Sequence, residues 1–288
     1  MRYIIKNGSI AAEFDSSGAE LRSVIKNGKE YMWCGDSKFW GRTSPVLFPF
    51  VGSVRNGVYR VGGIEYAMGQ HGFARDMEFQ LAGQTENSIS FILRSDEETL
   101  KKYPFDFILR ITYTVEVSTL RIGWEVENPS DRDMYFSIGA HPAFMCPFDG
   151  GRQSDYKLKF DSDGDIRYYH IKDGLLDRSS YYTLPVKEGH ADITDGMFDR
   201  DALIIEDFQA SEISLCRPDG SEYVTVRTSA PLFGLWSPAG KNAPFICIEP
   251  WYGRCDALDF DGELSERDHS NTLAAGGHFC AEYTVEFK

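Results

Sequence analysis

Short segments of alternating apolar and polar residues, or of β-branched residues, recur along the whole chain. Each is closed by Gly, Asn, Asp or Pro, the residues that favour turns. This pattern predicts many β-strands, among them Tyr3–Ile5, Ser9–Phe14, Ser88–Leu93 and Ile108–Val117.

Several neighbouring strands are separated by only a few turn-forming residues, which is typical of hairpins. Such turns are Lys26-Asn27-Gly28 before Tyr31-Met32-Trp33, Val61-Gly62-Gly63-Ile64, and Arg217-Pro218-Asp219-Gly220 before Tyr223–Arg227. Because hairpins join antiparallel strands, we expect largely antiparallel sheets.

Helical patterns are sparse. The best candidate, Asp96–Lys102, spans about two turns and stops before Pro104, whose ring disfavours a continued helix. No linker, charge run or fixed-period repeat divides the chain. We therefore predict an all-β protein, a single β-sandwich domain over residues 1–288 with few short helices, rather than two domains.

Composition narrows the range of partners. The 288 residues are 42% hydrophobic, enough for a sizeable core, and carry a formal charge of -14. That charge repels phosphate backbones and anionic membranes, so we expect neither nucleic acid nor a membrane as a partner. The chain could be a monomer or a homodimer.

Neither targeting nor metal signals stand out. The N-terminus Met-Arg-Tyr-Ile-Ile-Lys-Asn-Gly has a charge and a turn where a signal peptide would carry its apolar run, which predicts a cytoplasmic protein. The six cysteines lack the spacing of a structural zinc site, so we expect reduced thiols, no metal and no cofactor. They are Cys34, Cys146, Cys216, Cys247, Cys255 and Cys280.

Four segments place ionisable residues among aromatic and turn-forming residues, a setting more typical of a ligand cleft than of a core. They are Phe48–Gly57, Gln70–Asp76, Ile138–Phe144 and Ile246–Gly253.

Three residues of these segments suit acid–base chemistry. Glu249 ends an apolar run and precedes a proline, which predicts a partly buried carboxylate with a perturbed pKa. His71 and His141 each lie beside Gly or Pro and near Phe, and imidazole exchanges protons near neutral pH. Each residue taken alone also fits a structural role, such as a turn-capping Glu249 paired with Arg254. The spacing cannot show whether the three meet.

Other chemistries find little support. The chain has no G-x-S-x-G elbow, P-loop or H-E-x-x-H motif. The acidic stretch Asp161–Asp165 resembles a calcium loop, but Lys172 stands where the twelfth-position Glu is needed, so we interpret it as a surface turn. Trp236 offers a flat aromatic face of the kind that packs against a pyranose, although core packing is the alternative.

The four segments, in this order, resemble the aldose 1-epimerase (galactose mutarotase) superfamily, and most closely its LacX-like branch. The similarity covers essentially the whole chain. Its most specific parts are Leu47-Phe48-Pro49 with Arg55, His71-Gly72-Phe73-Ala74-Arg75, His141-Pro142-Ala143-Phe144 and Ile248-Glu249-Pro250-Trp251.

The resemblance implies a β-supersandwich of around 30 strands with an open sugar cleft, and a mutarotase that opens and recloses an aldose ring without a cofactor. By motif, Glu249 becomes the general base and His141 the general acid. His71 and Arg55 would bind sugar hydroxyls, and Asp201 resembles the family's substrate-binding aspartate. Which histidine is the acid stays open. We further expect that a carboxylate and a protonated imidazole stabilise each other's charge.

Two departures leave the substrate open. Val54 stands before Arg55 where galactose mutarotases usually show Asn, and Trp251 with Tyr252 replaces a Gln after the catalytic glutamate. A hexose 6-phosphate is an alternative substrate, with Arg42, Arg55 or Arg75 contacting the phosphate. The rival functions are a non-catalytic sugar-binding protein and a glycoside-processing enzyme, and the second normally needs two carboxylates.

Overall fold

The computed structural model describes residues 1–162 and 164–288. Two large sheets dominate it, and every pairing between named strands in the described residues is antiparallel. The prediction of an all-β, largely antiparallel fold is confirmed. The described residues hold 25 strands, fewer than the number that the resemblance implied.

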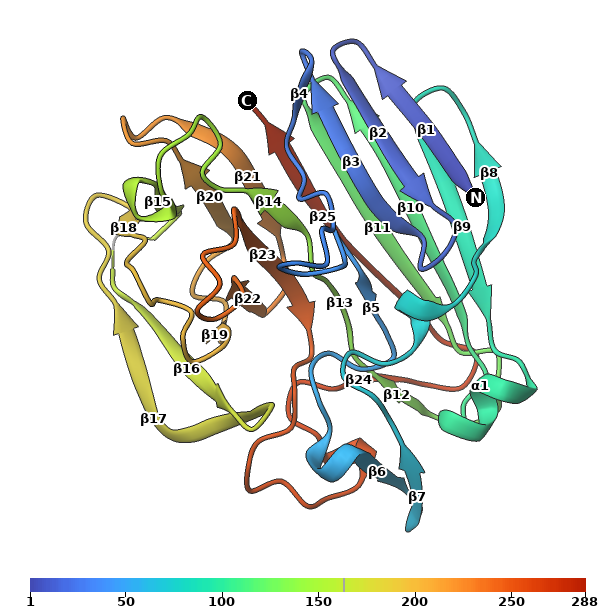
Figure 1. The fold of residues 1–288 in the computed structure, drawn as a ribbon. Helices are drawn as coiled ribbons and strands as arrows, with labels where there is room; N and C mark the ends of the chain where they lie inside the picture. Colours follow the sequence, from blue (N-terminus) through green and yellow to red (C-terminus); the bar gives the residue numbers. More distant parts are fainter. Residues whose placement is uncertain (163) are drawn as a thin grey trace.

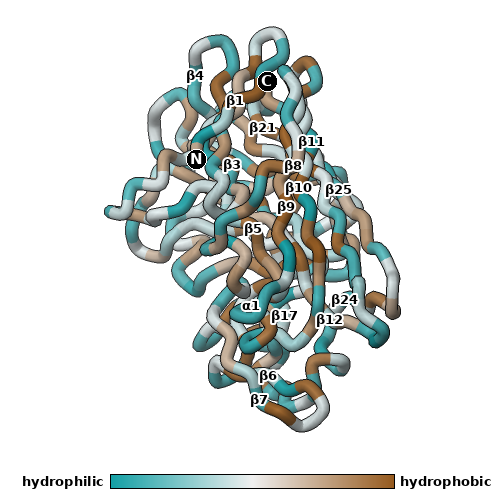
Figure 2. The backbone as a smooth tube through the Cα atoms, turned by 90° about the vertical axis from the view of Figure 1, so that its right-hand side faces the viewer, coloured by the Kyte–Doolittle hydropathy of each residue, from teal (hydrophilic) through white to brown (hydrophobic). Residues whose placement is uncertain are grey.

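The first large sheet has nine strands, whose order in space differs from their order in the chain. In spatial order they are β18 (His190–Asp192), β15 (Lys157–Phe160), β20 (Glu212–Cys216), β21 (Glu222–Thr228), β25 (His278–Phe287), β11 (Thr119–Glu127), β10 (Ile108–Glu116), β9 (Ser88–Arg94) and β8 (Gln80–Gln84). Figure 2 shows β9, β10, β11 and β25 side by side, with hydrophilic and hydrophobic residues mixed along them. The inward side chains of β10 alternate with outward ones, as a strand with one buried face requires.

The second large sheet has eight strands and carries the residues of interest. Its order is β17 (Leu175–Leu184), β16 (Ile166–Lys172), β19 (Leu203–Ile205), β22 (Leu232–Trp236), β23 (Phe245–Tyr252), β13 (Ile138–Ala140) and β5 (Val46–Leu47), and β14 (Ala143–Met145) also pairs with β23. In Figure 1 this sheet occupies the left and centre, with the nine-stranded sheet behind it and to the right.

Smaller sheets complete the structure. The N-terminal sheet lies against the β8–β11 end of the nine-stranded sheet (Figure 1), where Phe14 packs on Tyr113 with ring centroids 4.5 Å apart. The small sheets are β1 (Arg2–Asn7), β2 (Ile10–Asp15), β3 (Glu20–Lys26) and β4 (Lys29–Glu30), then β6 (Val58–Val61) with β7 (Ile64–Ala67), and β12 (Met134–Phe136) with β24 (Asn271–Leu273).

Helices are short, as expected. Helix α1 covers Glu97–Lys102, and Asp96 caps its N-terminus by accepting a hydrogen bond from the Thr99 N–H at 2.8 Å. Four 3₁₀ turns cover Arg55–Gly57, Ala74–Asp76, Gln153–Asp155 and Leu264–Glu266. No helix in the described ranges is long and apolar enough to cross a membrane.

The hairpins at Val61–Ile64 and Arg217–Gly220 form as predicted. The turn predicted at Lys26-Asn27-Gly28 also forms, between β3 and β4, and the Tyr31 N–H still donates to the Val24 carbonyl at 3.0 Å, but Met32 and Trp33 leave this hairpin. The Glu30 carboxylate accepts hydrogen bonds from the N–H groups of Tyr31 and Met32, and the chain then turns to pair with β14.

One large apolar core includes residues from Ile5 to Phe287 and takes side chains from both large sheets. Trp124 of β11 meets Tyr252 of β23 edge to face at 6.3 Å, so the two sheets pack as the layers of a sandwich. That residues 1–288 form a single domain stays a prediction.

Candidate active site

Strand β23 presents its residues alternately to the two faces of its sheet, because successive side chains in a strand point in opposite directions. Ile246 and Ile248 pack into the main core, whereas Cys247 and Trp251 belong to small apolar clusters on the other face. Glu249 therefore projects from that second face, where the residue is 1% exposed.

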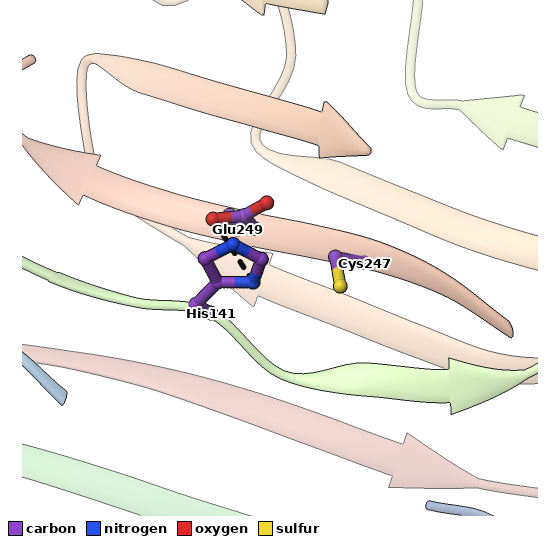
Figure 3. Close-up of side chains that lie close together, drawn as sticks. All are labelled: His141, Cys247 and Glu249. Carbon is purple, nitrogen blue, oxygen red and sulfur yellow. Dashed lines mark ion pairs between the residues drawn. The ribbon is translucent and has the colours of Figure 1, made fainter. Parts of the chain in front are cut away.

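His141 reaches Glu249 through strand pairing. It directly follows β13, and Gly139 of β13 pairs with Trp251 of β23. Nδ1 of His141 lies 3.4 Å from Oε2 of Glu249 (Figure 3). Both atoms are buried, and neither has a hydrogen-bond partner among the described residues. Buried polar atoms are normally paired, so these two are available to a ligand.

His71 is held by a reciprocal pair of hydrogen bonds. The backbone N–H of His71 donates to the Gly52 carbonyl at 2.8 Å, and the backbone N–H of Gly52 donates to the ring Nδ1 of His71 at 3.0 Å. Because Nδ1 accepts, the neutral ring carries its proton on Nε2. Gly72 must be glycine, since a Cβ there would lie 2.3 Å from the Phe48 carbonyl oxygen. The rings of His71 and His141 lie 5.6 Å apart.

Two half-buried tryptophans flank His141. The Trp40 ring stacks on its imidazole with centroids 4.7 Å apart, and Trp236 meets the imidazole edge to face at 5.3 Å. The two indoles are 5.4 Å apart. They supply flat apolar surface beside the acid–base pair.

The Trp251 ring lies against glycines of both neighbouring strands. A Cβ at Gly139 would come within 2.6 Å of this ring, and one at Gly234 within 2.5 Å. Trp251 is buried, and its Nε1 has no full hydrogen bond in the described part of the chain. The glycines thus let a large indole lie flat beside Glu249.

Burial dominates the electrostatics of the pair. It lowers the pKa of His141 to about 3, with further lowering by the charges of Arg75 and Arg42. Burial also raises the pKa of Glu249 well above its usual range, and the charge of Asp201 raises it further, while the Trp251 side chain opposes the shift. For both residues burial is the largest cause of the pKa shift, and it favours the uncharged form of each. The expectation that each group holds its partner charged stays a prediction.

Asp201 is thus close enough to Glu249 to act on it electrostatically. Its backbone is left-handed, with φ at 71°, and its carboxylate accepts a hydrogen bond from the Ala202 N–H at 2.9 Å. Asp201 thus lies in a turn two residues before β19 begins.

Charged residues of both signs line a cleft at Trp40. The cleft has a volume of about 480 Å³, and its lining includes Arg2, Arg22, Arg42 and Arg75 together with Asp15, Glu20 and Asp76. Burial lowers the pKa of His71 well below its ordinary value, and the charges of His141, Arg75 and Arg42 add to the effect. Another hollow, of about 520 Å³, is lined by residues that include Gln153, Phe198 and Ser237, the neighbour of Trp236.

The arginine ion pairs leave one guanidinium partly free. Arg42 pairs with Asp76 at 2.7 Å. Arg75 donates to the Gln70 carbonyl at 2.7 Å, but its buried Nε is 3.9 Å from Asp76 and has no hydrogen bond within the described residues.

The structure therefore brings together Glu249, His141, His71 and Trp236, with Asp201 near enough to act on Glu249. Arg55 makes its contacts elsewhere, since its guanidinium donates to the Phe260 carbonyl at 3.0 Å. Its sugar-binding role stays a prediction.

Sequence reasoning overlooked Trp40 and the position of Cys247. The segment Phe39-Trp40-Gly41-Arg42 has the same mixture of aromatic, glycine and charge as the four segments chosen, and that signal could have found Trp40. Among the described residues, one group of potential metal ligands lies close together: His141, Cys247 and Glu249. The acidic turn at Asp161–Asp165 includes Asp163, which lies outside the described residues.

Comparisons with known proteins show a similarity that covers nearly the whole chain. Residues 1–283 match the model of the aldose 1-epimerase family. The chain is 32% identical over 273 residues to the chromosomal LacX protein of Lactococcus lactis, covering 91% of each chain.

Solved structures are similar over the full length. A galactose mutarotase related enzyme from Lactobacillus acidophilus is 35% identical, with a TM-score of 0.95 over 100% of this chain and 97% of the other. A galactose mutarotase-like protein from Lactobacillus casei is 29% identical, with a TM-score of 0.92 over 100% of both chains.

Proposed function

Because the chain belongs to the aldose 1-epimerase family and is an isomerase of the mutarotase type, we propose that it interconverts the α and β anomers of an aldose, with Glu249 as base and His141 as acid. The observation that carries this proposal is the 3.4 Å approach of two buried, unpartnered atoms, Nδ1 of His141 and Oε2 of Glu249. In a cyclic aldose, O1 and O5 are both bonded to C1. The two oxygens of the hemiacetal are therefore close enough together to contact Glu249 and His141 at the same time.

The reaction needs one proton shared by the pair. Glu249 takes the proton of the O1 hydroxyl while His141 delivers one to O5, the C1–O5 bond breaks, and the aldehyde forms. After rotation about C1–C2, the O5 hydroxyl attacks the other face of C1 and returns its proton to His141. Glu249 then protonates O1. Both residues end in their starting states.

The directions in which burial shifts the pKa values of Glu249 and His141 fit the state of the pair after ring opening. Ring opening leaves a protonated Glu249 and a neutral His141, and burial favours these same two uncharged forms. The buried site therefore stabilises the pair in the state that accompanies the open-chain aldehyde. It disfavours the charged pair that starts the reaction, so the bound sugar's hydrogen bonds must help to form that pair.

The remaining roles follow from position. His71 offers an Nε2–H donor and Asp201 a carboxylate acceptor to sugar hydroxyls. Trp236 and Trp40 offer apolar faces to the C–H surface of the ring.

The direct test is the rate of α-to-β interconversion of freshly dissolved glucose and galactose, followed by polarimetry. Wild type should accelerate it, and Glu249→Gln and His141→Asn should each lose at least about 100-fold, the usual share of a general acid or base. His278→Asn, at an exposed histidine of β25, is the matched control. Binding of sugar without acceleration by wild type would support a sugar sensor instead. Release of an alcohol from a glycoside would support glycoside processing.

A phosphorylated aldose is a second candidate, favoured by Arg42 and Arg75. Both guanidinium groups line the cleft at Trp40, and both lower the pKa of His141. A dianionic phosphate bound there would offset their charge and let His141 hold its proton more readily. The substrate would then assist in charging its own general acid.

This candidate makes a distinct prediction for glucose 6-phosphate against glucose. On this hypothesis, Arg75→Gln should lower kcat/KM for the phosphorylated sugar by about tenfold or more, the value of one charge-assisted contact, and cause no such loss with glucose, because the substitution also removes a charge that disfavours protonated His141. Arg110→Gln, on β10 of the other sheet, serves as the control. An equal loss for both sugars would refute phosphate binding at Arg75.

A further inference from the structure

The thiol of Cys247 lies beside the proposed acid–base pair. Cys247 and Glu249 are two residues apart on β23, so both side chains leave the same face of the sheet. A ring nitrogen of His141, Sγ of Cys247 and a carboxylate oxygen of Glu249 all lie within 4.8 Å of one another (Figure 3). The mutarotase chemistry proposed above does not use the thiol.

These three donors suit zinc, and they do not suit magnesium or calcium. Imidazole nitrogen, thiolate sulfur and carboxylate oxygen are the ligands of Zn²⁺, whereas Mg²⁺ and Ca²⁺ take oxygen ligands. Zinc sites with three protein ligands keep a fourth position open to a small molecule. Because the Cys247 thiol is neutral when free, binding would release its proton.

The distances are close to those of a formed site. At Zn–N and Zn–O lengths of about 2.1 Å, two ligands of a tetrahedron are about 3.4 Å apart. Nδ1 of His141 and Oε2 of Glu249 are already separated by 3.4 Å. The sulfur completes the set after a shift of about 1 Å, which side-chain rotation can supply.

The surroundings also favour a ligand. His141 and Glu249 are 7% and 1% exposed, and the two facing atoms lack hydrogen-bond partners in the part of the chain that is described. A cation held by a thiolate and a carboxylate would satisfy both atoms and neutralise the negative charge that burial otherwise disfavours.

We propose that His141, Cys247 and Glu249 form a zinc-binding site, and that Zn²⁺ bound there inhibits the enzyme by occupying the proposed base and acid. The inhibition rests on the proposed function, whereas the binding does not. A metal on Glu249 and His141 takes the lone pairs through which protons are exchanged. Zinc would thus compete with the sugar for the same groups.

The alternative is that Cys247 only fills the apolar cluster that it shares with Trp33, Ala143, Ala243 and Phe245. Free cysteine is commonly buried as a small apolar side chain. In that case the thiol is irrelevant to metal binding, and its removal leaves the zinc response unchanged.

The test measures binding and catalysis separately on the full-length chain. The exposed thiols Cys34 and Cys280 are first changed to serine, so that they do not bind metal. Co²⁺ then serves as a spectroscopic probe, because a cobalt–thiolate bond gives a near-ultraviolet charge-transfer band. Zn²⁺ affinity is measured by competition with a chromophoric chelator, and mutarotation by polarimetry with and without Zn²⁺.

We expect one Zn²⁺ per chain, a cobalt–thiolate band, and inhibition of mutarotation that EDTA reverses. Cys247→Ala should keep the metal-free rate, lose the band and bind Zn²⁺ at least tenfold more weakly. Cys216→Ala, which removes a buried thiol from the nine-stranded sheet, should behave as the parent.

Two results would overturn the proposal. One is the absence of the cobalt band in the parent protein, and the other is equal zinc affinity in Cys247→Ala and parent. If the parent shows the band but no mutarotation with any sugar, the metal site stands and the proposed function fails. The two hypotheses are therefore separable.

Discussion

The neutral state of His141 can be tested through stability rather than catalysis. Burial lowers the pKa of this imidazole from 6.5 to about 3, whereas in the unfolded chain the imidazole titrates near its ordinary value. Between these two pH values the unfolded chain binds a proton that the native chain does not. The free energy of unfolding must therefore fall as the pH falls below about 6.5.

The size of the effect follows from the shift. Each pH unit between the two pKa values costs about 1.4 kcal/mol, so lowering the pH from about 7.5 to 4.5 should destabilise wild type by roughly 3 kcal/mol through this residue. Asn at position 141 does not titrate and removes this contribution. Relative to wild type, His141→Asn should therefore gain about 3 kcal/mol between about pH 7.5 and pH 4.5.

Urea denaturation followed by circular dichroism at the two pH values measures this difference. Comparing variant and wild type at each pH separates this effect from the titration of Glu249, because a neutral His141 and a neutral Asn both place no charge beside that carboxyl group. His278→Asn, at the exposed first residue of β25, controls for the loss of a histidine. If the stability difference between His141→Asn and wild type is the same at both pH values, His141 is not held neutral and the argument fails.

Two further predictions concern the neighbours of Glu249. Gly234→Ala would place a methyl group 2.5 Å from the Trp251 ring, so it should destabilise the protein by about 1–3 kcal/mol and lower kcat/KM, as urea denaturation and polarimetry would show; unchanged values would mean that the ring moves freely. The pair needs one shared proton, and burial favours that proton on Glu249, so its loss at high pH sets the alkaline limb of the kcat/KM profile. Asp201→Asn removes a charge that raises the pKa of Glu249, and this limb should therefore move to lower pH. A limb that stays in place would show that Asp201 does not act on the proton of the pair.

The amino-acid pattern predicted the class of this fold and several of its hairpins. A strand is indicated by side chains that alternate with a period of two and by the turn residues at its ends. A hairpin such as that at Val61–Ile64 can therefore be predicted from a few neighbouring residues. The helix at α1 needed only its Asp96 cap and the proline that follows it. The motifs around His71, His141 and Glu249 could also be found in the sequence, because the glycine, proline and aromatic residues lie next to the ionisable residue along the chain.

Only the tertiary structure decided how those residues meet. Residues 141 and 249 are neighbours because β13 pairs with β23, and no local pattern specifies which strands pair across more than 100 residues. The same pairing placed Cys247 beside the acid–base pair. Burial then set the direction of both pKa shifts, since desolvation depends on everything packed around a group. The sequence therefore identified the residue types of the acid–base pair, whereas the tertiary structure determined their protonation and placed Cys247 beside them.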